Sequence, residues 1–269
     1  QNLINLTEDS FLTMMTPYLP TPPPPAGEAE TTSSTTTKHE KGIYTIPNAK
    51  ERVRLIIEMA QSLQTHHKGS ATLFLSGANR SADRLVHMIL AHFPGFRDTA
   101  IHPYTGTWIA FYKRAQILVA DLWAALGGDG DGAVSMPVVE AHGLDLCKFV
   151  DMDRITTFAD YRVPQLLRNL GVLEYGKDLA ERVDSGKEIQ IFSLEELYIR
   201  ASTVVAVDEL VVDVKKKVVM EEEKNTINKK SKDTNINAVK MDWFLWNIGE
   251  ELDRKGCLER HHRVRTIFY

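Results

Sequence analysis

Cysteine is scarce in this chain, and its scarcity excludes two kinds of construction. The only cysteines are Cys147 and Cys257; they cannot form a disulfide framework, and neither has a partner at the spacing of metal ligands. This cysteine usage is typical of a reducing, intracellular setting. We therefore expect a cytoplasmic protein, with the nucleus as a second compatible compartment.

Long apolar runs and an excess of positive charge are also missing. No run approaches the roughly 20 apolar residues that span a bilayer. The N-terminus lacks a basic region followed by an apolar stretch and a cleavage site, so we expect neither a membrane partner nor a secretory signal. The formal net charge is -4 and the isoelectric point is about 6.2. No global basic field therefore indicates direct binding of nucleic acid.

The composition that remains is that of a globular protein with one core. The chain has 269 residues, of which 43% are hydrophobic, which is enough for a sizeable core. In residues 1–42, a proline run and a Ser/Thr tract have little to bury, so we expect a disordered N-terminal linker. Residues 43–269 are the expected domain, with a charged surface insert at about 215–237. Because the chain starts at Gln1, we expect a fragment or a processed form.

Apolar residues recur at helical spacing along most of the expected domain. Residues that favour helix N-caps mark three starts: Asn48, followed by Glu51 as in a capping box, Ser81 and Ser193. A further aromatic helix is predicted over residues 241–249. The sequence therefore predicts an all-α fold around a single core, with a minor β element as the alternative and no internal repeat.

The strongest helical pattern spans residues 108–126, which are apolar on nearly all sides. Lys113 lies in the first half of this stretch, between aromatic neighbours. Its side chain either extends to solvent along its apolar stem or is held inside against a carboxylate. The local sequence favours solvent as long as no carboxylate partner is identified.

Residues 158–171 carry one acid directly before a predicted helix. Pro164 suits a first helical turn, so a helix should begin near it, with an apolar face made by Leu166, Leu167, Leu170 and Leu173. Asp160 lies near the positive end of this helix, where a charged carboxylate is favoured. On local sequence alone, a helix cap or a turn is the favoured interpretation of Asp160.

Familiar catalytic and metal-binding motifs are missing. The glycine-rich residues 127–132 are too short for an EF-hand loop and lack its terminal glutamate. His66 and His67 are adjacent and point apart on a helix, which makes them poor joint ligands. We expect neither a metal nor a cofactor.

Several blocks in order resemble the signature blocks of the queuosine salvage family. The two longest are Phe111-Tyr-Lys-Arg-Ala-Gln-Ile-Leu-Val119 and Phe158-Ala-Asp-Tyr-Arg-Val-Pro-Gln165. Phe93-Pro-Gly-Phe-Arg-Asp98 precedes them, and Leu245-Trp246 and His262-Arg-Val-Arg-Thr-Ile-Phe-Tyr269 follow. The likeness runs from about residue 43 to the end of the chain.

The resemblance implies release of queuine from queuosine 5′-phosphate, for reuse in tRNA modification, by N-glycoside hydrolysis. It also implies a helical fold related to helix-hairpin-helix DNA glycosylases, and a catalytic pair that falls here on Asp160 and Lys113. Queuine is a 7-deazapurine without an N7 to protonate, so an oxocarbenium-like ribose must carry much of the charge. A carboxylate at Asp160 would stabilise that charge and orient or deprotonate water. Lys113 would keep Asp160 ionised and orient it, or donate toward the leaving base.

Further substrate contacts are expected beside the acid and at the C-terminus. The candidates for contact with base or ribose are Tyr161, Arg162 and Gln165, although Arg162 also fits a weak surface ion pair. The candidates for the 5′-phosphate are His262, Arg263 and Arg265, because arginine matches phosphate oxygens; a plain basic tail is the equal alternative. Phe111 is a candidate for stacking on the base, as is Trp246, with a core role as the simpler interpretation of each.

Two departures from the family keep other functions open. An Asn-Phe-Ser-Phe-Trp block that precedes these regions in the family is missing, and Tyr198 stands where the family usually has glutamate. The first alternative is therefore a protein that binds queuine or a nucleotide without hydrolysis. The second is a base-excising enzyme acting on DNA, against which the acidic charge argues. We expect a monomer acting on a small molecule.

Overall fold

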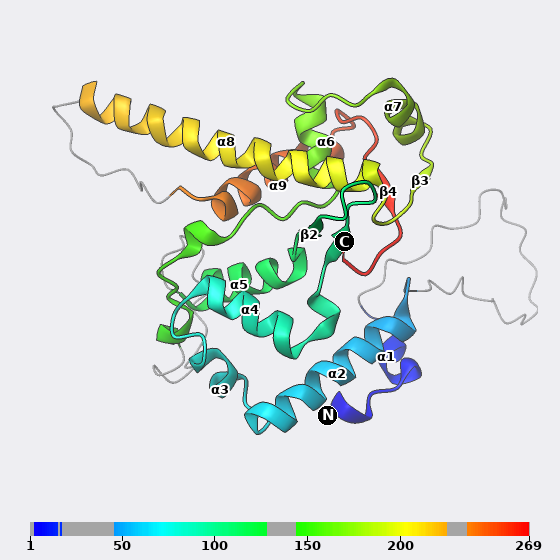
Figure 1. Cartoon of the computed structure of the whole chain (residues 1–269), viewed down its shortest axis with the longest axis vertical. Coiled ribbons are helices and arrows are strands. Elements are labelled where there is room, and N and C mark those ends of the chain that lie inside the picture. Colours follow the sequence, from blue (N-terminus) through cyan, green and yellow to red (C-terminus); the bar gives the residue numbers. More distant parts are fainter. Residues whose placement is uncertain (1–2, 16, 18–45, 128–143, 225–235, 269) are drawn as a thin grey trace, which may run out of the picture.

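The computed structural model describes residues 3–15, 17, 46–127, 144–224 and 236–268 (Figure 1). The α-helices are α1 (Glu8–Met15), α2 (Ala49–His67), α3 (Ala71–Ser76), α4 (Ala82–His92), α5 (Lys113–Leu126), α6 (Arg162–Asn169), α7 (Lys177–Asp184), α8 (Leu194–Lys224) and α9 (Ala238–Arg254). Short 3-10 helices are η1 (Leu3–Asn5), η3 (Pro94–Phe96), η4 (Leu144–Cys147) and η5 (Met152–Arg154). None of the helices in these ranges combines the length and apolar character that a membrane crossing requires.

Two small sheets supplement the helices. Strands β1 (Thr99–Ile101) and β2 (Trp108–Ala110) form an antiparallel hairpin in which Ala100 is opposite Ile109. Strands β3 (Glu188–Ile189) and β4 (Arg263–Val264) pair in parallel and hold the C-terminal segment beside α7 (Figure 1). The predicted all-α fold with a minor β element is thus confirmed, whereas kinship with helix-hairpin-helix proteins stays a prediction.

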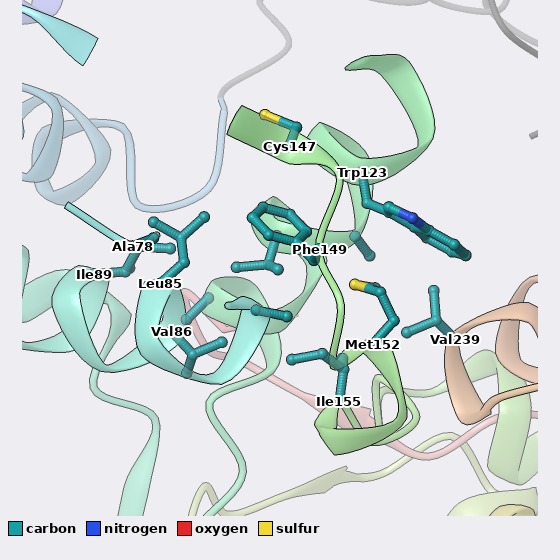
Figure 2. Close-up of a cluster of buried hydrophobic side chains, with 14 of the residues drawn as sticks. Ala78, Leu85, Val86, Ile89, Trp123, Cys147, Phe149, Met152, Ile155 and Val239 are labelled. Carbon is teal, nitrogen blue, oxygen red and sulfur yellow. The ribbon is translucent and has the colours of Figure 1, made fainter. Parts of the chain in front are cut away.

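The largest hydrophobic cluster lies between α4, α5 and the segment that follows η4 (Figure 2). Leu85 and Ile89 of α4 are fully buried there, as the helical pattern after Ser81 predicts. The Ser81 hydroxyl accepts the N–H of Arg84, so the predicted N-cap is confirmed. Helix α5 packs against α4 through this cluster.

A second hydrophobic cluster joins α6, α8 and α9, which lie together in Figure 1. Leu166 and Leu167 of α6 are fully buried in it, but Leu170 is 58% exposed. The reason is that α6 ends at Asn169, and Gly171 then takes a left-handed conformation that turns the chain away. Leu173, beyond the turn, packs against the same cluster, so the predicted apolar face is wrong only at Leu170.

The predicted helix over residues 108–126 is wrong in its first part. Residues Trp108–Ala110 pair with β1, and Phe111 and Tyr112 donate backbone N–H groups to the carbonyl of Asp98. Tyr112 has φ 51, a left-handed value that ends the strand and starts α5 at Lys113. Apolar residues recur at helical spacing on both sides of this turn, so periodicity alone does not reveal where the helix begins.

Two other local predictions differ from the structure. Asn48 does precede α2, but it has φ 56 and no side-chain cap hydrogen bond, and Glu51 contacts Arg54 instead. The stretch expected to be a surface insert begins within α8, which continues to Lys224. At its other end, Asn237 is buried and caps α9. Residues 225–235 of this stretch, the expected proline-rich linker and residues 128–132 of the glycine-rich loop lie outside the described residues.

Candidate active site

Lys113 and Asp160, far apart in the sequence, meet as a buried pair. Lys113 Nζ lies 3.4 Å from Asp160 Oδ2, and the two side chains are only 8% and 13% exposed. A pair this little exposed interacts more strongly than a surface pair, because less water screens it. Of the two alternatives for Lys113, the structure shows the contact with a carboxylate.

The two oxygens of Asp160 have different partners. Oδ1 accepts the backbone N–H of Arg162 at 2.8 Å, a contact across two residues that makes a turn before α6. Oδ2 faces the Lys113 ammonium. Asp160 therefore fits both interpretations: Oδ1 makes the turn, and Oδ2 makes the contact with Lys113. The first contact fixes the orientation that the second requires.

A second carboxylate, Asp242 of α9, supports the loop that leads to Asp160. Its side chain is buried, and Oδ1 accepts the Thr157 hydroxyl at 2.5 Å and the Phe158 N–H at 2.8 Å. Burial raises the pKa of Asp242 to about 6, although both hydrogen bonds lower it. The charge of Asp160 raises this pKa further and that of Lys113 lowers it. Asp242, Asp160 and Lys113 thus share one electrostatic environment.

Arg162 and Gln165 form a buried polar network between α6, α9 and the C-terminal segment. Arg162 donates to Glu250 at 2.6 Å, to Asp253 at 3.0 Å and to the Gln165 side-chain oxygen at 2.6 Å. The Gln165 amide donates to the carbonyl of Glu259 at 2.5 Å. A weak surface ion pair is therefore the wrong interpretation of Arg162. Contact of either residue with base or ribose stays a prediction.

The aromatic candidates differ in their surroundings. Tyr161 follows the acid, and its ring centroid lies 4.7 Å from that of His261. Burial raises the pKa of Tyr161, and the nearby charge of Asp160 adds to this rise. Phe111 is buried with its ring against the guanidinium of Arg200, which fits the simpler interpretation of a core residue. Stacking of Phe111 on a base stays a prediction.

The three C-terminal candidates lie in two environments. His262 is buried, and this burial lowers its pKa to about 3, with nearby positive charges, Arg200 among them, adding to the effect. Arg263 and Arg265 are exposed and approach Glu188 of β3. A neutral His262 brings no charge to a phosphate, although one ring N–H can still donate a hydrogen bond. Phosphate binding by these three residues stays a prediction.

Several residues that support the pair were not predicted from the sequence. Asp242 and Thr157 hold the loop before Asp160, and His261 packs against Tyr161. One signal was available for Asp242, because an acid on the buried side of an otherwise aromatic helix needs a partner. No comparable signal marked Thr157 or His261.

A cavity of about 470 Å³ adjoins this loop. Its lining includes Phe111, Thr157 and Ala159, with Ala201 and Val205 of α8 on another side. The volume is in the range of small-molecule sites. Within the described ranges, no group of three or more His, Cys, Asp or Glu side chains is placed to hold a metal ion.

The fold and the site define a mostly helical protein with a buried lysine–aspartate pair. The sequence pattern described as Queuosine salvage protein matches residues 26–269. The chain belongs to the queuosine salvage protein family.

Individual relatives agree with this assignment. The chain is 40% identical over 224 residues to the queuosine 5′-phosphate N-glycosylase/hydrolase of Dictyostelium discoideum. It is 37% identical to the protein of that name from Sphaerobacter thermophilus over 224 residues, and 33% identical to that from Bos taurus over 226 residues. Each alignment covers 83% of this chain and 59% of the relative. The chain thus spans less than two thirds of the length of these relatives.

Proposed function

We propose that this chain carries the catalytic pair of an N-glycoside hydrolase that releases queuine from queuosine 5′-phosphate. The observation that supports the proposal most strongly is the buried contact between Lys113 and Asp160. These two residues belong to separate blocks that resemble the family, and the fold brings them together. Membership of the family and the names of the relatives supply the substrate class.

Asp160 acts at the ribose in this proposal. As the bond between C1′ and the base nitrogen breaks, positive charge builds on the ribose, and a fixed carboxylate beside it stabilises that charge. Water then forms the new bond to C1′, and Asp160 accepts one of its protons. The Arg162 N–H on Oδ1 keeps the carboxylate from rotating and leaves Oδ2 for this work.

Lys113 is the partner of Asp160 and, in this proposal, a proton donor to the leaving base. At 3.4 Å it holds Oδ2 in place. When the base leaves, the electron pair of the broken bond stays on the base nitrogen, which takes up a proton. The Lys113 ammonium or a water molecule delivers that proton. No step in this scheme requires a cofactor.

The direct test is release of free queuine by the chain from queuosine 5′-phosphate, followed by chromatography. The proposal predicts multiple turnovers, with the nucleoside queuosine as the comparison for the role of the phosphate. Titration of queuine into the chain, followed by calorimetry, tests the alternative of a binding protein. Tight binding without any release would replace hydrolysis by capture. Excision of a base from duplex DNA, with steep salt dependence of binding, would favour the DNA-directed alternative.

A further inference from the structure

One buried ion pair connects the two segments that carry Lys113 and Asp160. Asp98 and Arg200 are both fully buried, and Arg200 Nη1 donates to Asp98 Oδ1 at 2.9 Å while Nη2 donates to Asp98 Oδ2. Arg200 lies on α8, and Asp98 immediately precedes β1. Neither residue belongs to the pair that we propose for catalysis.

On one side, Asp98 holds the turn that begins α5. Its carbonyl accepts the N–H groups of Phe111 at 3.0 Å and of Tyr112 at 3.3 Å. Its carboxylate Oδ2 accepts the N–H of Lys113 at 3.4 Å. Tyr112 is in the left-handed region, a strained state for a residue other than glycine that persists only where its surroundings fix it. Asp98 supplies that constraint.

On the other side, Arg200 holds the loop that ends at Asp160. Its Nε donates to the carbonyl of Ala159 at 3.1 Å. Its guanidinium carbon lies 3.9 Å from the centroid of the Phe111 ring, so the same side chain also packs on the segment before Lys113. A second carboxylate, Glu196, also accepts from Arg200 Nη1, at 3.2 Å. One guanidinium therefore touches both segments.

Stability alone does not explain this arrangement. Taking both charges out of water is costly, and a well-packed apolar pair often serves stability equally well. An apolar pair cannot bind the Ala159 carbonyl and the Lys113 N–H at the same time. What the ion pair provides is a fixed relation between the two segments.

We propose that Arg200 and Asp98 are positioning residues that set the placement of Lys113 relative to Asp160. The expected effect on kcat rests on the proposed hydrolase function. The expected effect on the position of the two segments does not. Loss of the pair lets the Tyr112 turn and the Asp160 loop move independently. A displacement of about 1 Å between reacting groups is enough to cost roughly 100-fold in rate.

The test compares Arg200→Lys and Asp98→Asn with a matched control, Arg168→Lys. Arg168 also makes a two-pronged contact, with Asp184 at 2.7 and 3.0 Å, on the far end of α6. We expect kcat to fall about 100-fold in the Arg200 and Asp98 variants, with KM within about 3-fold, and the control to keep both constants. In Arg200→Ala, added guanidinium ion should restore part of kcat. Parent-like kcat in folded Arg200→Lys would overturn the proposal.

Hydrogen exchange provides a readout that does not depend on catalysis. In Arg200→Lys, we expect residues 111–113 and the loop before Asp160 to lose protection together, while both segments stay protected in Arg168→Lys. Unchanged exchange at both segments, or a loss at only one of them, would overturn the positioning role even if the chain were active. If the parent chain releases no queuine but both segments lose protection together in Arg200→Lys, only the hydrolase function is overturned. If Arg200→Lys does not fold, Asp98→Asn gives the same readout.

Discussion

At the scale of single residues, the site depends on how carboxylates are held. One oxygen of Asp160 accepts a backbone N–H, and the other contacts the Lys113 ammonium. One oxygen of Asp242, by contrast, accepts a backbone N–H from the loop before Asp160. In the proposed function, the first arrangement presents a negative charge to the substrate. In the second arrangement, burial opposes the ionisation of the Asp242 carboxyl group and so raises its pKa.

Replacement of Lys113 tests the first arrangement. In Lys113→Met, Asp160 Oδ2 loses its contact with the ammonium group, and the proposed reaction loses its candidate proton donor. We expect kcat to fall by about 100-fold or more, the usual scale for a positioned proton donor or its equivalent. Steady-state kinetics measure this, with the exposed Lys148→Met as the control. A variant with raised KM and parent-like kcat would show that Lys113 only binds substrate.

Replacement of Asp242 tests the second arrangement through pH. The unfolded-state pKa is 3.8 and the folded-state pKa is raised to about 6. Between these values, the folded state holds a proton that the unfolded state has lost, so the parent loses stability as pH rises through this window. Asparagine does not titrate. As pH rises from about 4 to about 7, the free energy of unfolding of Asp242→Asn should therefore rise by on the order of 2–3 kcal/mol relative to that of the parent. Urea unfolding at both pH values measures this, and a pH-independent difference would contradict it.

At the scale of elements, the packing of α6 on α9 supports the site. Gly249 of α9 lies where a Cβ would be 2.8 Å from Arg162 Cδ and 3.0 Å from Cγ. Arg162 cannot swing away easily, because Glu250, Asp253 and Gln165 hold its guanidinium. The backbone N–H of the same arginine holds Asp160. Close packing of two helices is thus connected directly to the acid.

The variant Gly249→Ala tests this connection. Alanine favours a helix by about 1 kcal/mol over glycine, but the overlap with Arg162 should outweigh that gain and leave a net loss of about 1–2 kcal/mol. We also expect lower kcat, since Arg162 moves. Gly176→Ala is the control, because nothing lies within 4 Å of a Cβ there. A gain in stability with unchanged kcat would show that α6 and α9 pack more loosely.

Helix interiors were predictable from sequence, but several of the connections between helices were not. Periodicity identified α4 and α9, because their buried faces follow the helical repeat. It failed at residues 108–112, where the left-handed Tyr112 depends on Asp98, a residue well removed in sequence. The N-cap preference failed at Asn48, whose backbone is left-handed and whose side chain makes no cap hydrogen bond. The Tyr112 turn is held by the contacts of Asp98, which the local sequence does not encode.

At the scale of the whole molecule, the chain unites residues from distant parts of its length. Lys113 is at the start of α5, Asp160 precedes α6, Asp242 is on α9, and His261 returns beside Tyr161 near the C-terminus. The resemblance of separate blocks to one family anticipated the meeting of Lys113 and Asp160. It did not anticipate the supporting contacts of Asp242 and Arg200, which only the folded chain displays.

The most direct measurement of the central claim is queuine release by the parent chain and by Asp160→Asn. Asparagine keeps an oxygen for the Arg162 N–H, so the turn should persist while the negative charge is lost. Asp184→Asn, on the exposed side of α7, is the control for loss of a carboxylate. We expect release by the parent and the control, and a loss of at least about 100-fold in Asp160→Asn. Equal release by the parent and Asp160→Asn would contradict the role of Asp160.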